Sequence, residues 1–270
     1  MYAFRAAALH NFRWLYLLTL AIALLMAGVS LAGLLFPAAV YPSGDLRQAF
    51  VSNDVVNLFI GLPILLGSLA GVRRGRLLGL LFWPGALFYV TYNSFAYAVA
   101  LPPALPFGVH AALVGMSLVA IAGLLASIDP AAVQQRLGGA VPERLSGGVL
   151  AAFGLLFFGW RAALVAQALS GAAPLPGPEL ATAAADLLIT PAWVAGGVLL
   201  WRRQAPGYVC GVGLLFQASM LFAGLLVFFL LQPLLAGVPF SAEDCAVIFA
   251  MGLFCFVPFG LFVRGAAARA

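Results

Sequence analysis

The chain has 270 residues, of which 64% are hydrophobic and only 8% are charged, and its net charge is +5. Soluble globular proteins contain about 25% charged residues, so this chain cannot cover its surface with polar groups, and a soluble fold is excluded. All thirteen basic residues are arginine, and no basic stripe interleaved with aromatic residues accompanies them. Nucleic acid is therefore set aside as a partner.

Apolar runs of about twenty residues follow one another along the chain. This length predicts membrane-spanning helices, because barrel strands alternate apolar and polar residues over about ten positions. The first run, 13–36, is longer than the apolar core of a cleavable signal peptide, so we interpret it as an uncleaved signal-anchor helix. Further runs lie at about 53–72, 77–101, 105–127, 147–169, 183–201, 207–233 and 244–263. The sequence predicts an all-α transmembrane bundle of about eight helices.

The arginines predict how this bundle is oriented. With eight spans and the N-terminus inside, eleven of the thirteen arginines fall in inner segments, and only Arg47 and Arg161 do not. Cytoplasmic loops of membrane proteins carry such an excess of positive charge. We therefore expect both termini on the cytoplasmic side of a bacterial inner membrane. The polar stretch 129–146 is predicted to be a solvated cytoplasmic linker that includes a short surface helix.

The chain also contains the pattern of an internal repeat. Three residues around the end of the second run recur around the end of the sixth with identical spacings: Pro63, Arg74 and Gly79 match Pro191, Arg202 and Gly207. An even number of helices per repeat leaves both repeats in the same orientation, as in parallel-repeat transporters. The pattern predicts two four-helix halves, 1–128 and 147–270, joined by the linker 129–146.

The sixth run and the turn after it resemble a group of uncharacterised bacterial multi-pass membrane proteins. In that group an acid shortly before a proline opens a helix that ends in an Arg-Arg pair and Gly-Tyr. The residues that carry the resemblance here are Asp186, Pro191, Arg202, Arg203, Gly207 and Tyr208. In the first half Asp54 precedes its proline by about one helical turn more, which would leave both acids on one face. The resemblance implies a multi-pass membrane fold and supplies no catalytic residue.

Ionisable residues inside the apolar runs are the best functional clue, because each costs about 2.5–3.5 kcal/mol to insert. Arg161 is expected in the outer third of the fifth helix. Further polar residues are expected at a similar depth: Asp54, Tyr92, Asn93, Tyr97, His110, Asp186 and Glu243. One hypothesis is an outward-facing polar pocket in which Arg161 binds a carboxylate, a phosphate or a lipid head group. The alternatives are an ion pair with Asp186 or Glu243 that locks the helices together, or snorkelling of Arg161 to the head groups.

Several kinds of chemistry find no support. His110 is the one histidine within the predicted spans, so bis-histidine haem ligation is not expected. A zinc site would need further ligands, and a hydrogen-bonded structural histidine is the simpler interpretation. The three cysteines form no CxxC motif, and no P-loop, dinucleotide fingerprint or HExxH motif occurs. We expect no cofactor and no metal, and we assign no catalytic residue.

Three functions stay open at this point. The first is transport or binding of an anionic or amphipathic small molecule loaded from the outer side. The second is an accessory or structural subunit that packs against other membrane proteins. The third is an intramembrane lipid-modifying enzyme with His110, Glu243 or Asp54 as acid or base. The sequence favours the first, and it places no pair of groups at catalytic spacing for the third.

Overall fold

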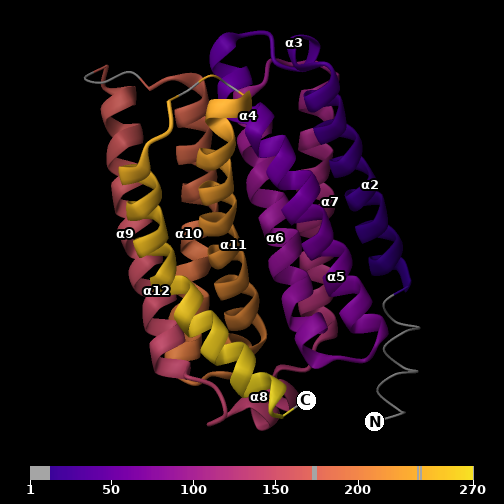
Figure 1. Ribbon diagram of the computed structural model, residues 1–270. Coiled ribbons are helices and arrows are strands. Elements are labelled where there is room, and N and C mark those ends of the chain that lie inside the picture. The colour runs from indigo at the N-terminus through magenta and orange to yellow at the C-terminus, as the bar shows by residue number, and fades with distance from the viewer. Residues whose placement is uncertain (1–12, 172–174, 236, 238, 270) are drawn as a thin grey trace.

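The computed structural model describes residues 13–171, 175–235, 237 and 239–269, and the regular structure within these ranges is helical (Figure 1). The long helices are α2 (Arg13–Leu35), α6 (Leu77–Ala100), α7 (Leu105–Ser127), α9 (Glu143–Leu169), α10 (Gly177–Trp201), α11 (Ala205–Leu235) and α12 (Ala242–Ala267). The shorter elements are α3 (Pro37–Val40), α4 (Gly44–Val56), the π-helical turn η1 (Asn57–Gly61), α5 (Leu62–Arg73) and α8 (Pro130–Leu137). Because α4, η1 and α5 follow one another without a break, they form one further long pass.

Successive passes run in opposite directions, so the connections gather at two ends of the bundle (Figure 1). We name these ends after the short helices that lie there, the α3 end and the α8 end. Arginines gather in the helix ends and turns of the α8 end: Arg13, Arg73, Arg74, Arg76, Arg136, Arg144, Arg202, Arg203, Arg264 and Arg269. Arg47 lies near the α3 end, Arg161 lies within α9, and Arg5 is outside the described residues. The charge of the described part is thus strongly asymmetric along the bundle.

Seven helical segments of the described chain are long and apolar enough to cross a membrane, with α4, η1 and α5 counted as one. The exception among the long passes is α6, which has 24 residues but carries several polar and aromatic side chains. Its position explains this composition, because α6 packs against α5, α7, α10 and α11 and sixteen of its residues are buried. A helix surrounded by protein does not need an apolar surface on every side.

The outside of the bundle is apolar, as expected for a fold solvated by lipid. Large side chains such as Leu24, Leu105 and Leu234 are 74%, 82% and 80% exposed. By contrast, the interior contains buried polar pairs, for example the Trp83 indole N–H, which donates to the Thr19 hydroxyl over 3.1 Å. The chain is therefore a multi-pass helical protein whose apolar groups face outward as well as inward.

The second pass differs from the sequence prediction, which began it near residue 53. The helix begins at Gly44, because the Ser43 hydroxyl accepts the backbone N–H of Leu46 over 3.2 Å and caps it. The added turns are polar but pack against α2 and α11. Further along, Pro63 has no N–H for the regular hydrogen bond, and the chain widens into η1 just before it.

The stretch 129–146 contains the short helix expected there, but it is solvated on one side only, because its other side packs against the bundle. It contains α8, whose Val133 and Leu137 side chains are buried against the bundle, and α8 packs on α11. The carboxylate of Glu143 accepts the Gly139 backbone N–H over 2.7 Å and the Tyr208 hydroxyl over 3.0 Å. The bond from Tyr208 connects this stretch to the start of α11, and Glu143 is only 5% exposed.

The turns α5–α6 and α10–α11 have the same backbone hydrogen bonds at positions 128 residues apart. The N–H of residue 74 bonds to the carbonyl of 70, 75 to 72 and 76 to 71, and likewise 202 to 198, 203 to 200 and 204 to 199. Gly75 and Arg203 both have positive φ angles, 71° and 57°. The repeated Pro–Arg–Gly pattern of the sequence thus coincides with one turn geometry used twice.

The central helices α6 and α11 cross at two glycines that share this same spacing, Gly85 and Gly213. A Cβ added at Gly85 would lie 2.7 Å from the Gly213 Cα, and one added at Gly213 would lie 2.9 Å from the Leu81 carbonyl oxygen. Real Cβ atoms do not approach backbone so closely. Small residues at a crossing let two transmembrane helices pack backbone to backbone.

We expect Gly85→Ala to destabilise the bundle, because the new methyl group forces α6 and α11 apart. Overpacking of this kind costs about 1–3 kcal/mol. The measurement is thermal unfolding of the purified protein in detergent. Gly115→Ala in α7 is the matched control, since a Cβ there meets nothing within 4 Å. Equal melting temperatures for the two variants would contradict the close crossing.

Candidate functional site

Arg161 belongs to an ion pair that joins three helices. Its Nε donates to Asp186 Oδ2 over 2.6 Å, which ties α9 to α10. The Tyr92 hydroxyl of α6 donates to the other carboxylate oxygen, Oδ1, over 3.1 Å. On its far side the guanidinium lies 4.2 Å from the ring centroid of Trp160. The ion-pair alternative of the sequence analysis is therefore the arrangement that the structure contains.

This ion pair is largely but not wholly covered, with side-chain exposures of 22% for Arg161 and 12% for Asp186. Asp186 faces inward because it shares a helix face with the buried residues Ala183, Ile189 and Thr190, at spacings of three and four. In a medium of low dielectric constant, removing either partner would leave an uncompensated charge. The pair thus connects α9 to α10 and places two ionised groups within otherwise apolar helices.

A second network surrounds Asp54, which is fully buried in α4. Its two carboxylate oxygens accept the hydroxyls of Tyr41 and Tyr97, over 2.6 and 2.9 Å. Asn53 extends the network, because its amide donates to Tyr97 Oη and to the side-chain oxygen of Asn93, each over 3.2 Å. Within the described ranges no basic side chain lies within ion-pair distance of Asp54. Two tyrosine hydroxyls solvate this carboxyl group.

Gly33 on α2 makes room for the Asp54 network. A Cβ at this position would collide with the Asp54 carboxylate and lie 2.6 Å from Tyr41 Oη. The absence of a side chain there lets α2 cover the carboxyl group closely. Sequence reasoning missed Gly33, Tyr41 and Asn53, because a glycine in an apolar run and residues at a helix entrance carry no distinct signal.

His110 of α7 is 2% exposed and stacks on the Tyr97 ring, with centroids 4.3 Å apart and planes 11° from parallel. Neither ring nitrogen has a hydrogen-bond partner in the described part of the chain. The expected hydrogen-bonded histidine is thus a stacked one. Its imidazole packs flat against one face of the Tyr97 ring, and the hydroxyl of the same tyrosine donates a hydrogen bond to Asp54.

The predicted site residues fall into two networks instead of one pocket. Arg161, Asp186 and Tyr92 form the first, and Asp54, Asn93, Tyr97 and His110 belong to the second. Tyr92 and Asn93 are neighbours on α6 but point about 100° apart, so this one helix supplies a member to each network. Glu243 lies exposed in the first turn of α12 and makes no salt bridge to either network within the described ranges. No three His, Cys, Asp or Glu side chains in those ranges gather closely enough to hold a metal ion.

We expect Tyr41→Phe to lower the free energy of unfolding by about 1–3 kcal/mol, because it leaves one oxygen of a buried carboxylate without its donor. Asp54→Leu, which removes both acceptor oxygens, should also destabilise the fold. The double variant should lose less than the two single losses added together, since both remove the same bond. Chemical or thermal unfolding of the four proteins measures this coupling. Strict additivity would mean that the bond does not form.

No protein-family model matches this sequence, and no curated protein and no solved structure is significantly similar to it. A functional assignment therefore has to come from the chemistry of the two networks. Both consist of ionisable side chains held by hydrogen bonds among helices that are apolar and long enough for a bilayer. On this evidence from composition and fold, the chain is a multi-pass integral membrane protein.

Proposed function

We propose that the protein binds, and in a transport cycle carries, an anionic or amphipathic small molecule at Arg161, which the molecule reaches from the α3 end. The observation that carries this proposal is the incomplete use of the guanidinium. In the described part of the chain its one hydrogen bond comes from Nε, and the side chain is 22% exposed. Both terminal nitrogens are thus left for a carboxylate or phosphate, which arginine binds in a bidentate manner.

The proposal includes an orientation in which the α8 end is cytoplasmic. Ten arginines at that end support it, because positively charged segments are retained on the cytoplasmic side. We count α6 as an eighth span. It connects the end of α5 at the α8 end to the start of α7 at the α3 end, so α6 crosses the membrane together with these two helices. A bacterial inner membrane, with the described chain beginning and ending at the cytoplasmic face, is the corresponding location.

We further propose that the bundle is built from two parallel four-helix halves. The matching turns and the contact between Gly85 and Gly213 support this arrangement. Residues at corresponding positions of two repeats can touch each other only beside the two-fold axis that relates the repeats. Here this pseudo-symmetry axis would pass between α6 and α11 and run along the bundle. In transporters with such repeats the substrate site lies between the halves. Tyr92 and Asp186 come from different halves and meet at the proposed site.

Asp186 competes with an incoming anion for Arg161. The groups bonded to this carboxylate are Arg161 of α9 and Tyr92 of α6. When Asp186 takes up a proton its attraction for the guanidinium falls, and the anion can take its place. Anion binding should therefore be tighter at lower pH and accompanied by the uptake of a proton, the kind of coupling that intramembrane carboxyl groups serve in transporters.

The first test measures thermal stabilisation of the purified protein by two named probes, hexanoate and hexyl phosphate. We expect both to raise the melting temperature of the wild type, with a larger effect at pH 5.5 than at pH 7.5. The effect should vanish in Arg161→Gln/Asp186→Asn, which replaces the ion pair by two neutral amides of similar size. Arg47→Gln, near the same end, is the matched control and should respond like the wild type. A retained response in the double variant would refute the site.

The second test isolates the competition between Asp186 and the anion. Asp186→Asn imitates the protonated carboxyl group and keeps an oxygen for the Tyr92 hydroxyl. We expect this variant to be less stable without anion, because Arg161 loses its counter-charge. At pH 7.5 its dissociation constant for hexyl phosphate should be about tenfold lower than that of the wild type, which corresponds to about 1.4 kcal/mol. Unchanged affinity, or a pH dependence equal to that of the wild type, would contradict the competition.

A further inference from the structure

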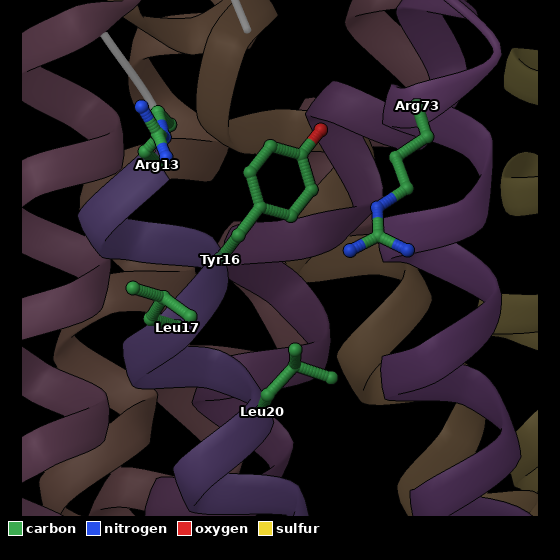
Figure 2. A pocket seen from close by; sticks show the side chains of 5 residues that line it. All are labelled: Arg13, Tyr16, Leu17, Leu20 and Arg73. Carbon is green, nitrogen blue, oxygen red and sulfur yellow. The ribbon is translucent and has the colours of Figure 1, made fainter. Parts of the chain in front are cut away.

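A pocket of about 270 Å³ opens between α2 and α5 at the α8 end, far along the bundle from Arg161. Its lining residues are Arg13, Tyr16, Leu17, Leu20 and Arg73 (Figure 2). Figure 2 shows the Tyr16 hydroxyl lying between the two arginine side chains, and Leu17 and Leu20 lie about one and two turns beyond Arg13 along α2. The pocket is therefore cationic at one end and apolar at the other.

The Tyr16 hydroxyl has no partner that would explain its burial. The residue is 6% exposed, and its oxygen makes no hydrogen bond in the described part of the chain. Its ring packs against Trp83 with centroids 4.9 Å apart and planes tilted by 35°, and the Arg73 guanidinium lies 5.4 Å from the ring centroid. Both neighbours thus hold the ring in place, while the buried hydroxyl is left without a hydrogen-bond partner. A buried donor without a partner is destabilising, so a ligand oxygen at this point would be stabilising.

The two arginines of the pocket are not neutralised. Neither Arg13 nor Arg73 forms a salt bridge in the described ranges, and no acidic residue lines the pocket. The twelve residues that precede Arg13 in the sequence contain no Asp or Glu either, whereas they do contain Arg5 and His10. The local charge therefore calls for an anion, and the Tyr16 hydroxyl adds a hydrogen-bond donor for it.

The apolar part of the pocket indicates what kind of molecule carries this anion. Leu17 is 68% exposed on the outer surface of α2, where lipid chains contact the bundle. A free phosphate would leave this surface unused, whereas a phospholipid would lay an acyl chain along Leu17 and Leu20. Basic pockets between transmembrane helices commonly bind anionic head groups in this way.

We propose that Arg13, Tyr16 and Arg73 bind the phosphodiester head group of an anionic phospholipid from the leaflet at the α8 end. The phosphate oxygens accept hydrogen bonds from both guanidinium groups and from the Tyr16 hydroxyl. A zwitterionic head group binds less well, because its ammonium group would meet two uncompensated arginines. This site is separate from Arg161, and its occupation does not depend on the function proposed there.

The experiment is native mass spectrometry of the full-length protein, with phosphatidylglycerol or phosphatidylcholine added to lipid-free detergent micelles. We expect one phosphatidylglycerol to bind at least tenfold more tightly than phosphatidylcholine. Arg13→Gln/Arg73→Gln should remove this preference. Tyr16→Phe, which keeps the ring and its contact with Trp83, should weaken phosphatidylglycerol binding by about three- to tenfold. The Tyr16→Phe result keeps the test valid if the arginine double variant fails to fold.

Controls separate this site from general attraction to positive charge and from free phosphate. Arg144→Gln at the start of α9 removes a charge from the same end outside the pocket, and it should leave the preference intact. An equal loss in that variant would overturn the proposal in favour of non-specific attraction. Inorganic phosphate is the second probe, and stabilisation by millimolar phosphate that matches phosphatidylglycerol and disappears in Tyr16→Phe would assign the site to free phosphate instead of lipid.

Discussion

The bundle depends on the polar side chains of α6 finding partners inside the protein, since lipid offers them none. Tyr92 meets Asp186 of α10, Tyr97 meets Asp54 of α4, and Thr91 shares a 2.8 Å hydrogen bond with Ser117 of α7. Each bond leads to a different neighbour, so α6 is held at the centre by contacts that cannot be exchanged for one another. Apolar packing alone would leave the rotation of this helix poorly determined, because lipid tails are as apolar as its leucines.

Close backbone packing provides the second constraint on the centre of the bundle. The α6–α11 crossing at Gly85 and Gly213 brings two halves of the chain into direct backbone contact. The same helix α6 also packs directly on α10, where Tyr92 reaches Asp186. Polar bonding across the centre and small residues at the crossing are thus two requirements of one geometry. A larger residue at either glycine would separate hydrogen-bonded groups several turns away.

The two ends of the bundle use ionisable residues in different ways. Near the α3 end, two carboxyl groups are bonded to protein groups: Asp186 pairs with the partly exposed Arg161, and the buried Asp54 accepts two tyrosine hydroxyls. At the α8 end most arginines are exposed, and the pocket of Tyr16 combines two of them with an unpartnered hydroxyl. A charged group that is paired within the protein suits a site in which a ligand replaces that partner, as proposed for Arg161. Arginines without an acidic partner suit a lasting interaction with lipid head groups.

The sequence by itself determined the fold class, the approximate helix bounds and the side on which arginines gather, because hydropathy and charge act within single segments. It also placed Arg161 and Asp186 at a similar depth, since helical rise converts sequence distance into height. Only the tertiary structure decided which polar groups share a neighbour. Rotation about each helix axis and the choice of adjacent helices separate Asp54 from Arg161, expose Glu243, and bring in Tyr41, Asn53 and Gly33. Those choices arise from packing among distant segments, which no local pattern encodes.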